Sequence, residues 1–154
     1  MNWSIESIAA HPDVVDTLAA WHHLEWGELM APWSLVDART ELTECVVANG
    51  FPATLVAYDE SRQLAGSVSL VATDAPEFPE FSPWLASLYV APLFRGRGLG
   101  KQLIDALVAH AHQLGFERLY LFTPVSPEIY RRSGWREIGK RQIGDHEVTL
   151  MVHE

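Results

Sequence analysis

Three features are scarce in this 154-residue chain: cysteine, long apolar runs, and basic side chains in the first ninety positions. Cys45 is the single cysteine, so an internal disulfide is excluded and a reducing compartment is expected. No run approaches the roughly eighteen apolar residues of a membrane span. No basic region precedes an apolar stretch near the start, as a secretory signal would require. We therefore expect a cytoplasmic protein without a membrane partner.

The scarcity of basic residues is confined to one part of the chain. Residues 1–90 hold two basic and thirteen acidic side chains, a net charge of −11, whereas residues 91–141 hold nine basic and four acidic ones, a net charge of +5. The overall charge of −9 argues against a nucleic-acid partner. The acidic part would attract a cation such as an amine, and the basic part would attract a polyanion.

The hydrophobic pattern predicts a mixed α/β fold in one domain, residues 1–154. Residues 73–83 contain three prolines and are predicted to form a loop. Asp13, Asn49-Gly50 and Gly115 are predicted helix-terminal residues. Helices are predicted over 14–28, 35–47, 99–114 and 126–132, and strands near 5–8 and over 53–58, 64–72, 84–90, 118–122, 135–141 and 147–152.

A basic, glycine-rich loop lies between the strand at 84–90 and the helix at 99–114. It reads Arg95-Gly96-Arg97-Gly98-Leu99-Gly100-Lys101. Unpaired backbone N–H groups at a helix start favour a phosphate or pyrophosphate, and the three basic side chains add positive charge. The Walker pattern fails because Gln102 follows Lys101, and the dinucleotide pattern fails because position 101 is not glycine. A nucleotide-binding domain is therefore not favoured.

The pattern that fits is R-x-x-G-x-G, formed by Arg95, Gly98 and Gly100. It resembles the acetyl-CoA signature of the GNAT superfamily of N-acetyltransferases, and the predicted order of elements is similar to that of the family. The resemblance implies a mixed, largely antiparallel sheet of about six or seven strands flanked by helices, with acetyl-CoA as co-substrate. The residues implied to bind it are Leu88, Tyr89 and Val90 for pantetheine and the carbonyl group, and Arg95, Gly96, Arg97, Gly98, Leu99, Gly100 and Lys101 for the pyrophosphate.

The segment from Pro127 to Trp135 resembles the family's Y-x-x-x-G-[FW] motif. The resemblance implies that Tyr130 is the general acid that protonates the CoA thiolate. It also implies that the strand at 84–90 carries a bulge that exposes backbone N–H groups, a feature that the sequence alone does not show. A homodimer is compatible with the resemblance.

The general base is not assigned by the sequence, because the strand at 84–90 has no carboxylate where many relatives have one. An aromatic wall for an amine is predicted in the N-terminal helices and the 73–83 loop. Cys45 has no evident catalytic partner, and no metal site is indicated. The open candidates for the base are Asp74, Glu77, Glu80, His22, His23, Glu28 and water; those for the wall are Trp26, Trp33, Phe78, Phe81 and Trp84.

The resemblance implies an N-acetyltransferase that moves acetyl from acetyl-CoA to a primary amine by direct transfer through a tetrahedral intermediate. We expect a small-molecule acceptor. The alternatives are a peptide N-terminus as acceptor, or a CoA-binding sensor module without catalysis.

Overall fold

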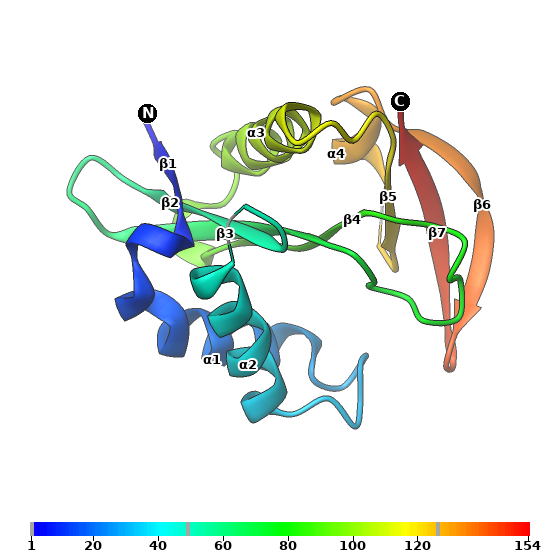
Figure 1. Cartoon of the computed structure of the whole chain (residues 1–154), viewed down its shortest axis with the longest axis horizontal. Helices are drawn as coiled ribbons and strands as arrows, with labels where there is room; N and C mark the ends of the chain where they lie inside the picture. The colour runs from blue at the N-terminus through cyan, green and yellow to red at the C-terminus, as the bar shows by residue number, and fades with distance from the viewer. Residues whose placement is uncertain (1, 49, 126) are drawn as a thin grey trace.

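The computed structural model describes residues 2–48, 50–125 and 127–154. Within them lies one seven-stranded sheet with the strand order β1-β2-β3-β4-β5-β7-β6 (Figure 1). Every neighbouring pair is antiparallel except β4 and β5. The strands are β1 Ser4–Ser7, β2 Ala53–Tyr58, β3 Leu64–Val71, β4 Trp84–Val90, β5 Leu119–Thr123, β6 Arg136–Ile143 and β7 His146–His153; the helices are α1 Val15–Trp26, α2 Leu35–Val47, α3 Leu99–Gln113 and α4 Glu128–Arg131.

Helices cover both faces of the sheet. Figure 1 shows α1 and α2 on one face and α3 on the other. Helix α3 buries Leu103 and Leu107 in the main core, and its periodic apolar positions produce that packing. Helix α2 buries Ala38, Leu42 and Cys45, which recur at helical spacing, against α1 and β2. Because helices cover both faces of the sheet, they limit the places at which a ligand could reach strand β4.

Helix α2 begins at a capping box. The side chain of Ser34 accepts a hydrogen bond from the backbone of Asp37, and the Asp37 carboxylate accepts one from the backbone of Ser34. With this start fixed, Asp37, Glu41 and Glu44 follow one another at spacings of four and three residues. They therefore lie on one side of the helix, next to its buried stripe.

Several predicted boundaries differ from the structure. The 14–28 helix is preceded by a 3₁₀ turn, Pro12–Val14, so Val14 rather than Asp13 is the cap of α1 and no side chain caps it. The first strand ends at Ser7, because Ile8 starts another 3₁₀ turn. The predicted 126–132 helix is the single turn α4, and Ser126 and Asn49 lie outside the described residues. Within the described residues, no helix is both long and apolar enough to cross a membrane.

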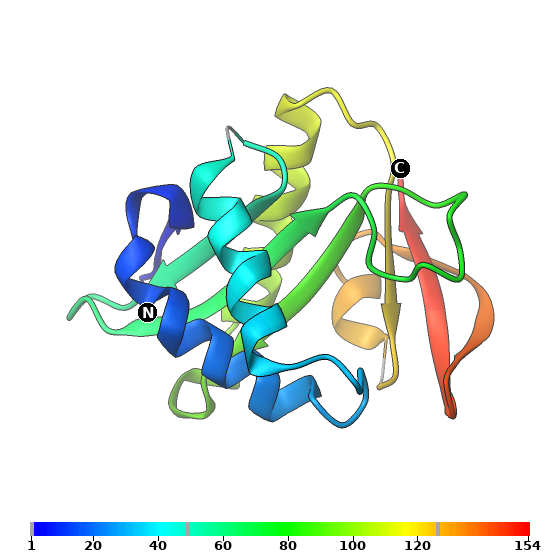
Figure 2. The same cartoon turned by 60° about the horizontal axis from the view of Figure 1, so that its bottom comes forward.

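Strand β4 is irregular at its centre. Ser67 of β3 pairs with Tyr89 of β4, and Ser69 pairs with Ala86. The two residues of β3 are two positions apart, whereas their partners on β4 are three positions apart, so β4 contains a bulge. Ser87 lies in this bulge with φ +56°, a left-handed conformation that is uncommon for serine. On its other side β4 pairs with β5 through one residue pair, Trp84 with Tyr120, and Figure 2 shows the two strands diverging from there. The divergence opens the sheet beside the bulge.

Candidate active site

The glycine-rich loop leads from β4 into α3 as the sequence indicates. Gly98 is the N-terminal cap of α3 with φ +85°, and Gly96 has φ +77°. Both conformations favour glycine, and a side chain added at either position would meet no atom within 4 Å. The loop therefore leaves open space at the positive end of a fifteen-residue helix.

Gly100 has a different role from the other loop glycines. A Cβ atom there would lie 2.9 Å from Cδ1 of Ile129, so glycine leaves room for the end of this side chain on the first turn of α3. Tyr130 follows Ile129 in α4, so the predicted acid lies close to the loop.

The basic side chains of Arg95 and Lys101 both have partners within the described chain. The Nε–H group of Arg95 donates to the carbonyl oxygen of Val90 at 2.8 Å, and its guanidinium lies 5.6 Å from the Tyr89 ring centre. Lys101 pairs with Asp105 at 2.8 Å. All of these ion-pair and guanidinium groups are exposed, so a polyanion can compete for them.

A cavity of about 650 Å³ lies where β4 and β5 diverge. Leu88 and Tyr130, which the sequence places in the site, both line it. Tyr89 does not line it: its buried ring lies beside Trp21, 5.5 Å away between ring centres, on the α1 side of the sheet. Val90 is partly buried and packs against the main core.

Tyr130 is held by packing rather than by polar contacts. Its ring meets Trp135 edge to face, with ring centres 6.4 Å apart, and its hydroxyl has no hydrogen-bond partner among the described residues. Burial, followed by the negative charge of Asp74, raises the pKa of Tyr130 to about 12. The phenol is therefore protonated at neutral pH and can donate a proton into the cavity.

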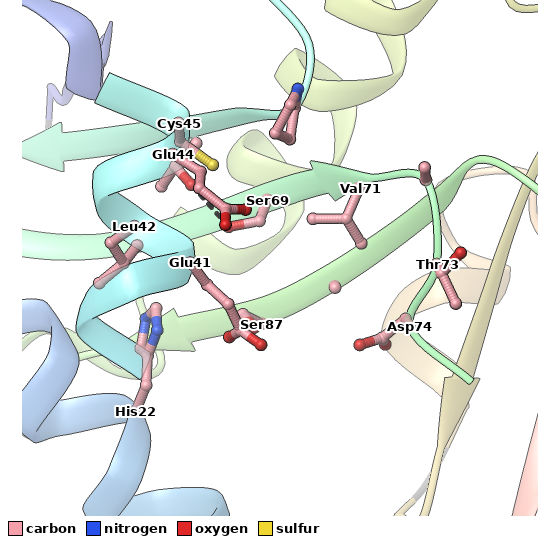
Figure 3. Close-up of a pocket in the computed structure, with 14 residues that line it drawn as sticks. His22, Glu41, Leu42, Glu44, Cys45, Ser69, Val71, Thr73, Asp74 and Ser87 are labelled. Atoms are coloured by element: carbon pink, nitrogen blue, oxygen red, sulfur yellow. Dashed lines mark hydrogen bonds between the residues drawn. The ribbon is translucent and has the colours of Figure 1, made fainter. Parts of the chain in front are cut away.

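Asp74 belongs to the irregular loop 73–83 and lines the same cavity as Tyr130. It also lines a second cavity of about 410 Å³, whose walls include Glu41, Glu44 and Cys45 (Figure 3). Desolvation by the surrounding protein, with a smaller contribution from the charge of Glu41, raises the pKa of Asp74 to about 7. This carboxyl group can thus accept a proton near neutral pH without being strongly acidic.

The other predicted bases are less well placed. Of the six named side chains, only Asp74 and His22 line either cavity. His22 is buried and bonded to the hydroxyl of Ser67 at 2.9 Å, and burial lowers its pKa to about 4. It is therefore a neutral packing residue at pH 7. The remaining candidates, which line neither cavity among the described residues, are Glu77, Glu80, His23 and Glu28.

The predicted aromatic wall is partly wrong. Trp26 and Trp33 do line the larger cavity. Phe78, Phe81 and Trp84 instead pack in a separate cluster with side chains of β5 and β7. From this half of the sheet, Phe122 lines the cavity together with Tyr130.

Two residues of the site were missed from the sequence. Ser87 occupies the bulge, which depends on pairing with β3 and has no local sequence signal. Glu41 lines both cavities from α2, and the Nε1–H group of Trp33 donates to one of its carboxylate oxygens at 3.2 Å. The acidic side of α2, Asp37-Glu41-Glu44, was the signal that could have identified it.

Residues 18–135 match the model of the acetyltransferase (GNAT) family. The chain belongs to this family. The match covers the bulged strand, the loop and Tyr130, so the predicted resemblance is confirmed, and with it the largely antiparallel fold.

Curated relatives of the chain are mycothiol acetyltransferases. The one from Acidothermus cellulolyticus is 47% identical over 79 residues, which are 50% of this chain and 22% of that protein. The one from Propionibacterium freudenreichii subsp. shermanii is 32% identical over 127 residues, 79% of this chain and 38% of that protein. The chain thus spans well under half the length of these relatives.

A solved structure extends the comparison to the fold. It is yncA from Salmonella typhimurium, a candidate acetyltransferase solved with its cofactor acetyl-CoA. The two chains superpose with a TM-score of 0.74 at 16% identity, over 100% of this chain and 94% of that one. The similarity shows the same architecture.

Proposed function

We propose that this GNAT domain transfers acetyl from acetyl-CoA to a primary amine of a small molecule. The observation that carries the proposal is one cavity that holds the bulged segment of β4, the phenol of Tyr130 and the carboxyl group of Asp74. The similarity to mycothiol acetyltransferases favours a small-molecule acceptor over a peptide.

Acetyl-CoA fits the residues present. The open space at Gly96 and Gly98 suits a pyrophosphate, which would accept hydrogen bonds from the N-terminal N–H groups of α3. The exposed side chains of Arg95, Arg97 and Lys101 add positive charge around it. Leu88 to Val90 would carry the pantetheine along the edge of β4 that diverges from β5, where strand pairing with β5 ends at Trp84.

The transfer needs a proton acceptor, an oxyanion site and a proton donor. The ammonium of the acceptor loses its proton to Asp74, and the free amine attacks the thioester carbonyl carbon. Backbone N–H groups at the β4 bulge stabilise the tetrahedral oxyanion. The carbon–sulfur bond then breaks, and the leaving thiolate takes the phenolic proton of Tyr130. The nitrogen loses its second proton, which restores the phenol of Tyr130, and Asp74 releases its proton to solvent. The products are an amide and CoA.

The test is CoA thiol release over a panel of amino acids, aminoglycosides, polyamines and short peptides with free N-termini. We expect release that depends on one class of small amine and that falls strongly in Asp74→Asn. Glu77→Gln, in the same loop but outside the cavity, is the matched control.

Other outcomes are equally informative. Release that depends only on peptides would replace the small-molecule acceptor by a peptide N-terminus. Tight acetyl-CoA binding in a titration without release for any acceptor would favour the sensor module.

A further inference from the structure

Ser87 adopts a backbone conformation that its residue type disfavours. Its φ is +56°, and in the described chain Arg62 is the other non-glycine residue with positive φ. Arg62 lies in the exposed turn between β2 and β3, where such a conformation is common. Ser87 instead lies within β4, where it and Leu88 together face the single residue Val68 of β3. Strained backbone that the surrounding structure holds in place is concentrated at functional sites.

On the neighbouring strands, the buried hydroxyl groups near the cavities are paired within the protein. Ser67 bonds to His22 at 2.9 Å. Thr54 and Ser69 bond to each other at 2.8 Å. The hydroxyl of Ser87 differs from these, because it has no hydrogen-bond partner among the described residues although the residue is only partly exposed. It can therefore both donate to and accept from a ligand.

Ser87 also lies where the two cavities meet. It lines both of them, and so does Asp74. Figure 3 shows the carboxylate of Asp74 pointing from the 73–83 loop in the direction of Ser87 on β4. Thr73 has a hydroxyl in the same wall, but this residue is exposed, so water satisfies it. Ser87 thus brings an unpaired hydroxyl group to the cavity that Tyr130 lines.

The hydrogens of the reacting nitrogen indicate what this hydroxyl can bind. An ammonium group carries three of them. Under the proposed function, one passes to Asp74 before the attack, and a second restores the phenol of Tyr130 after the thiolate leaves. The third stays on the nitrogen and becomes the amide hydrogen of the product. Where the acceptor displaces water, this N–H group needs a protein partner, and its direction fixes where the nitrogen lone pair points.

We infer that the hydroxyl oxygen of Ser87 accepts a hydrogen bond from the N–H group that the reacting nitrogen retains, and so aims the lone pair at the thioester carbon. This inference rests on the proposed function and adds an acceptor-binding residue to it. Ser87 keeps its own proton throughout, so the transfer needs no further proton donor or acceptor.

The test uses two CoA conjugates that imitate the joined substrates. In the first, the CoA sulfur is bonded to the acetyl carbon of N-butylacetamide, and in the second it is bonded in the same way to butyl acetate. The conjugates differ only in whether N–H or oxygen follows the carbonyl, so the ratio of their affinities isolates the N–H group. In calorimetric titrations, we expect the wild type to bind the amide about fivefold or more tightly than the ester. Equal affinities would overturn the inference and leave the proposed function intact.

Two substitutions separate the hydroxyl group from the backbone strain. Ser87→Ala removes the hydroxyl and keeps a side chain in the left-handed conformation, whereas Ser87→Gly removes both the hydroxyl and the strain. We expect both variants to lose the preference for the amide, and the melting temperature of Ser87→Gly not to fall below that of the wild type. If Ser87 only shaped the bulge, Ser87→Gly would keep the preference, because glycine adopts this conformation freely. That result would refute the inference.

Further variants and the turnover assay complete the test. Ser61→Ala removes a hydroxyl from the exposed turn between β2 and β3, outside both cavities, and should keep the wild-type ratio. Loss of the preference in Thr73→Val but not in Ser87→Ala would assign the hydrogen bond to Thr73 and overturn the inference. A preference for the amide that Ser87→Ala abolishes, without acetylation of any amine in the panel, would refute the proposed function alone.

Discussion

The proposed cofactor side and the proposed acceptor side of this domain are built in opposite ways. The cofactor side is one continuous stretch, from Leu88 to Lys101, whose shape follows from local glycine conformations and a helix start. The acceptor side combines α1, α2, the 73–83 loop and β5 around two cavities. Under the proposed function, local sequence therefore encodes the part that would bind acetyl-CoA, and long-range packing encodes the part that would select the acceptor.

The largest expected effect is on the acceptor side. Asp74→Asn should lower kcat by about 10²–10⁴-fold, the usual contribution of a general base. In the wild type, kcat should rise with pH through about 7 as Asp74, facing Glu41 and Tyr130, loses its proton. A pH–rate profile of the variant should lack this rise. If the rise persists in the variant, another group is the base.

Tyr130 lies where the two sides meet, and its hydroxyl should matter for turnover only. Tyr130→Phe should lower kcat by about 10–100-fold, at the lower end of general-acid effects, with little change in acetyl-CoA affinity. The melting temperature should change little, since the hydroxyl has no hydrogen-bond partner among the described residues. Unaltered kcat would exclude Tyr130 as the acid.

On the cofactor side, Gly98→Val should weaken acetyl-CoA binding at least tenfold. Gly115→Val is the matched control, because Gly115 also has positive φ and open surroundings but lies at the far end of α3. Both variants should lose about 1–2 kcal/mol of stability from the left-handed backbone. Calorimetry should separate them, and equal acetyl-CoA affinities would disprove the role of the loop.

The smallest effect is a gain in stability. Folding raises the pKa of Asp74 above its value in the unfolded chain. The carboxyl group's favourable contribution to the free energy of unfolding is therefore complete below about pH 4 and is lost as the pH rises through about 7. Asp74→Asn should therefore melt a few degrees above the wild type at pH 8, since about 1 kcal/mol corresponds to roughly 2–4 °C at this size. Thermal scans at pH 8 and pH 4 test this, and an advantage that is as large at pH 4 would contradict it.

Much of the fold was predictable because its signals are local. The apolar period of α3, the capping box at Ser34, and the proline content of residues 73–83 each specify the structure of their own segment. The boundary errors near Asp13 and Ile8 arise where 3₁₀ turns, which lack a strong sequence period, adjoin regular elements.

The sequence by itself determined the family and the glycine-rich loop, because a backbone that must turn sharply at a helix start permits few residue types. The candidate acid Tyr130 followed from the resemblance to the family. The tertiary structure decided the bulge at Ser87, which of the candidate bases line the cavities, and the place of Glu41 in the walls that Asp74 also lines. Those features depend on strand register, on desolvation and on charges brought together from distant segments. None of these is a property of a short stretch of chain.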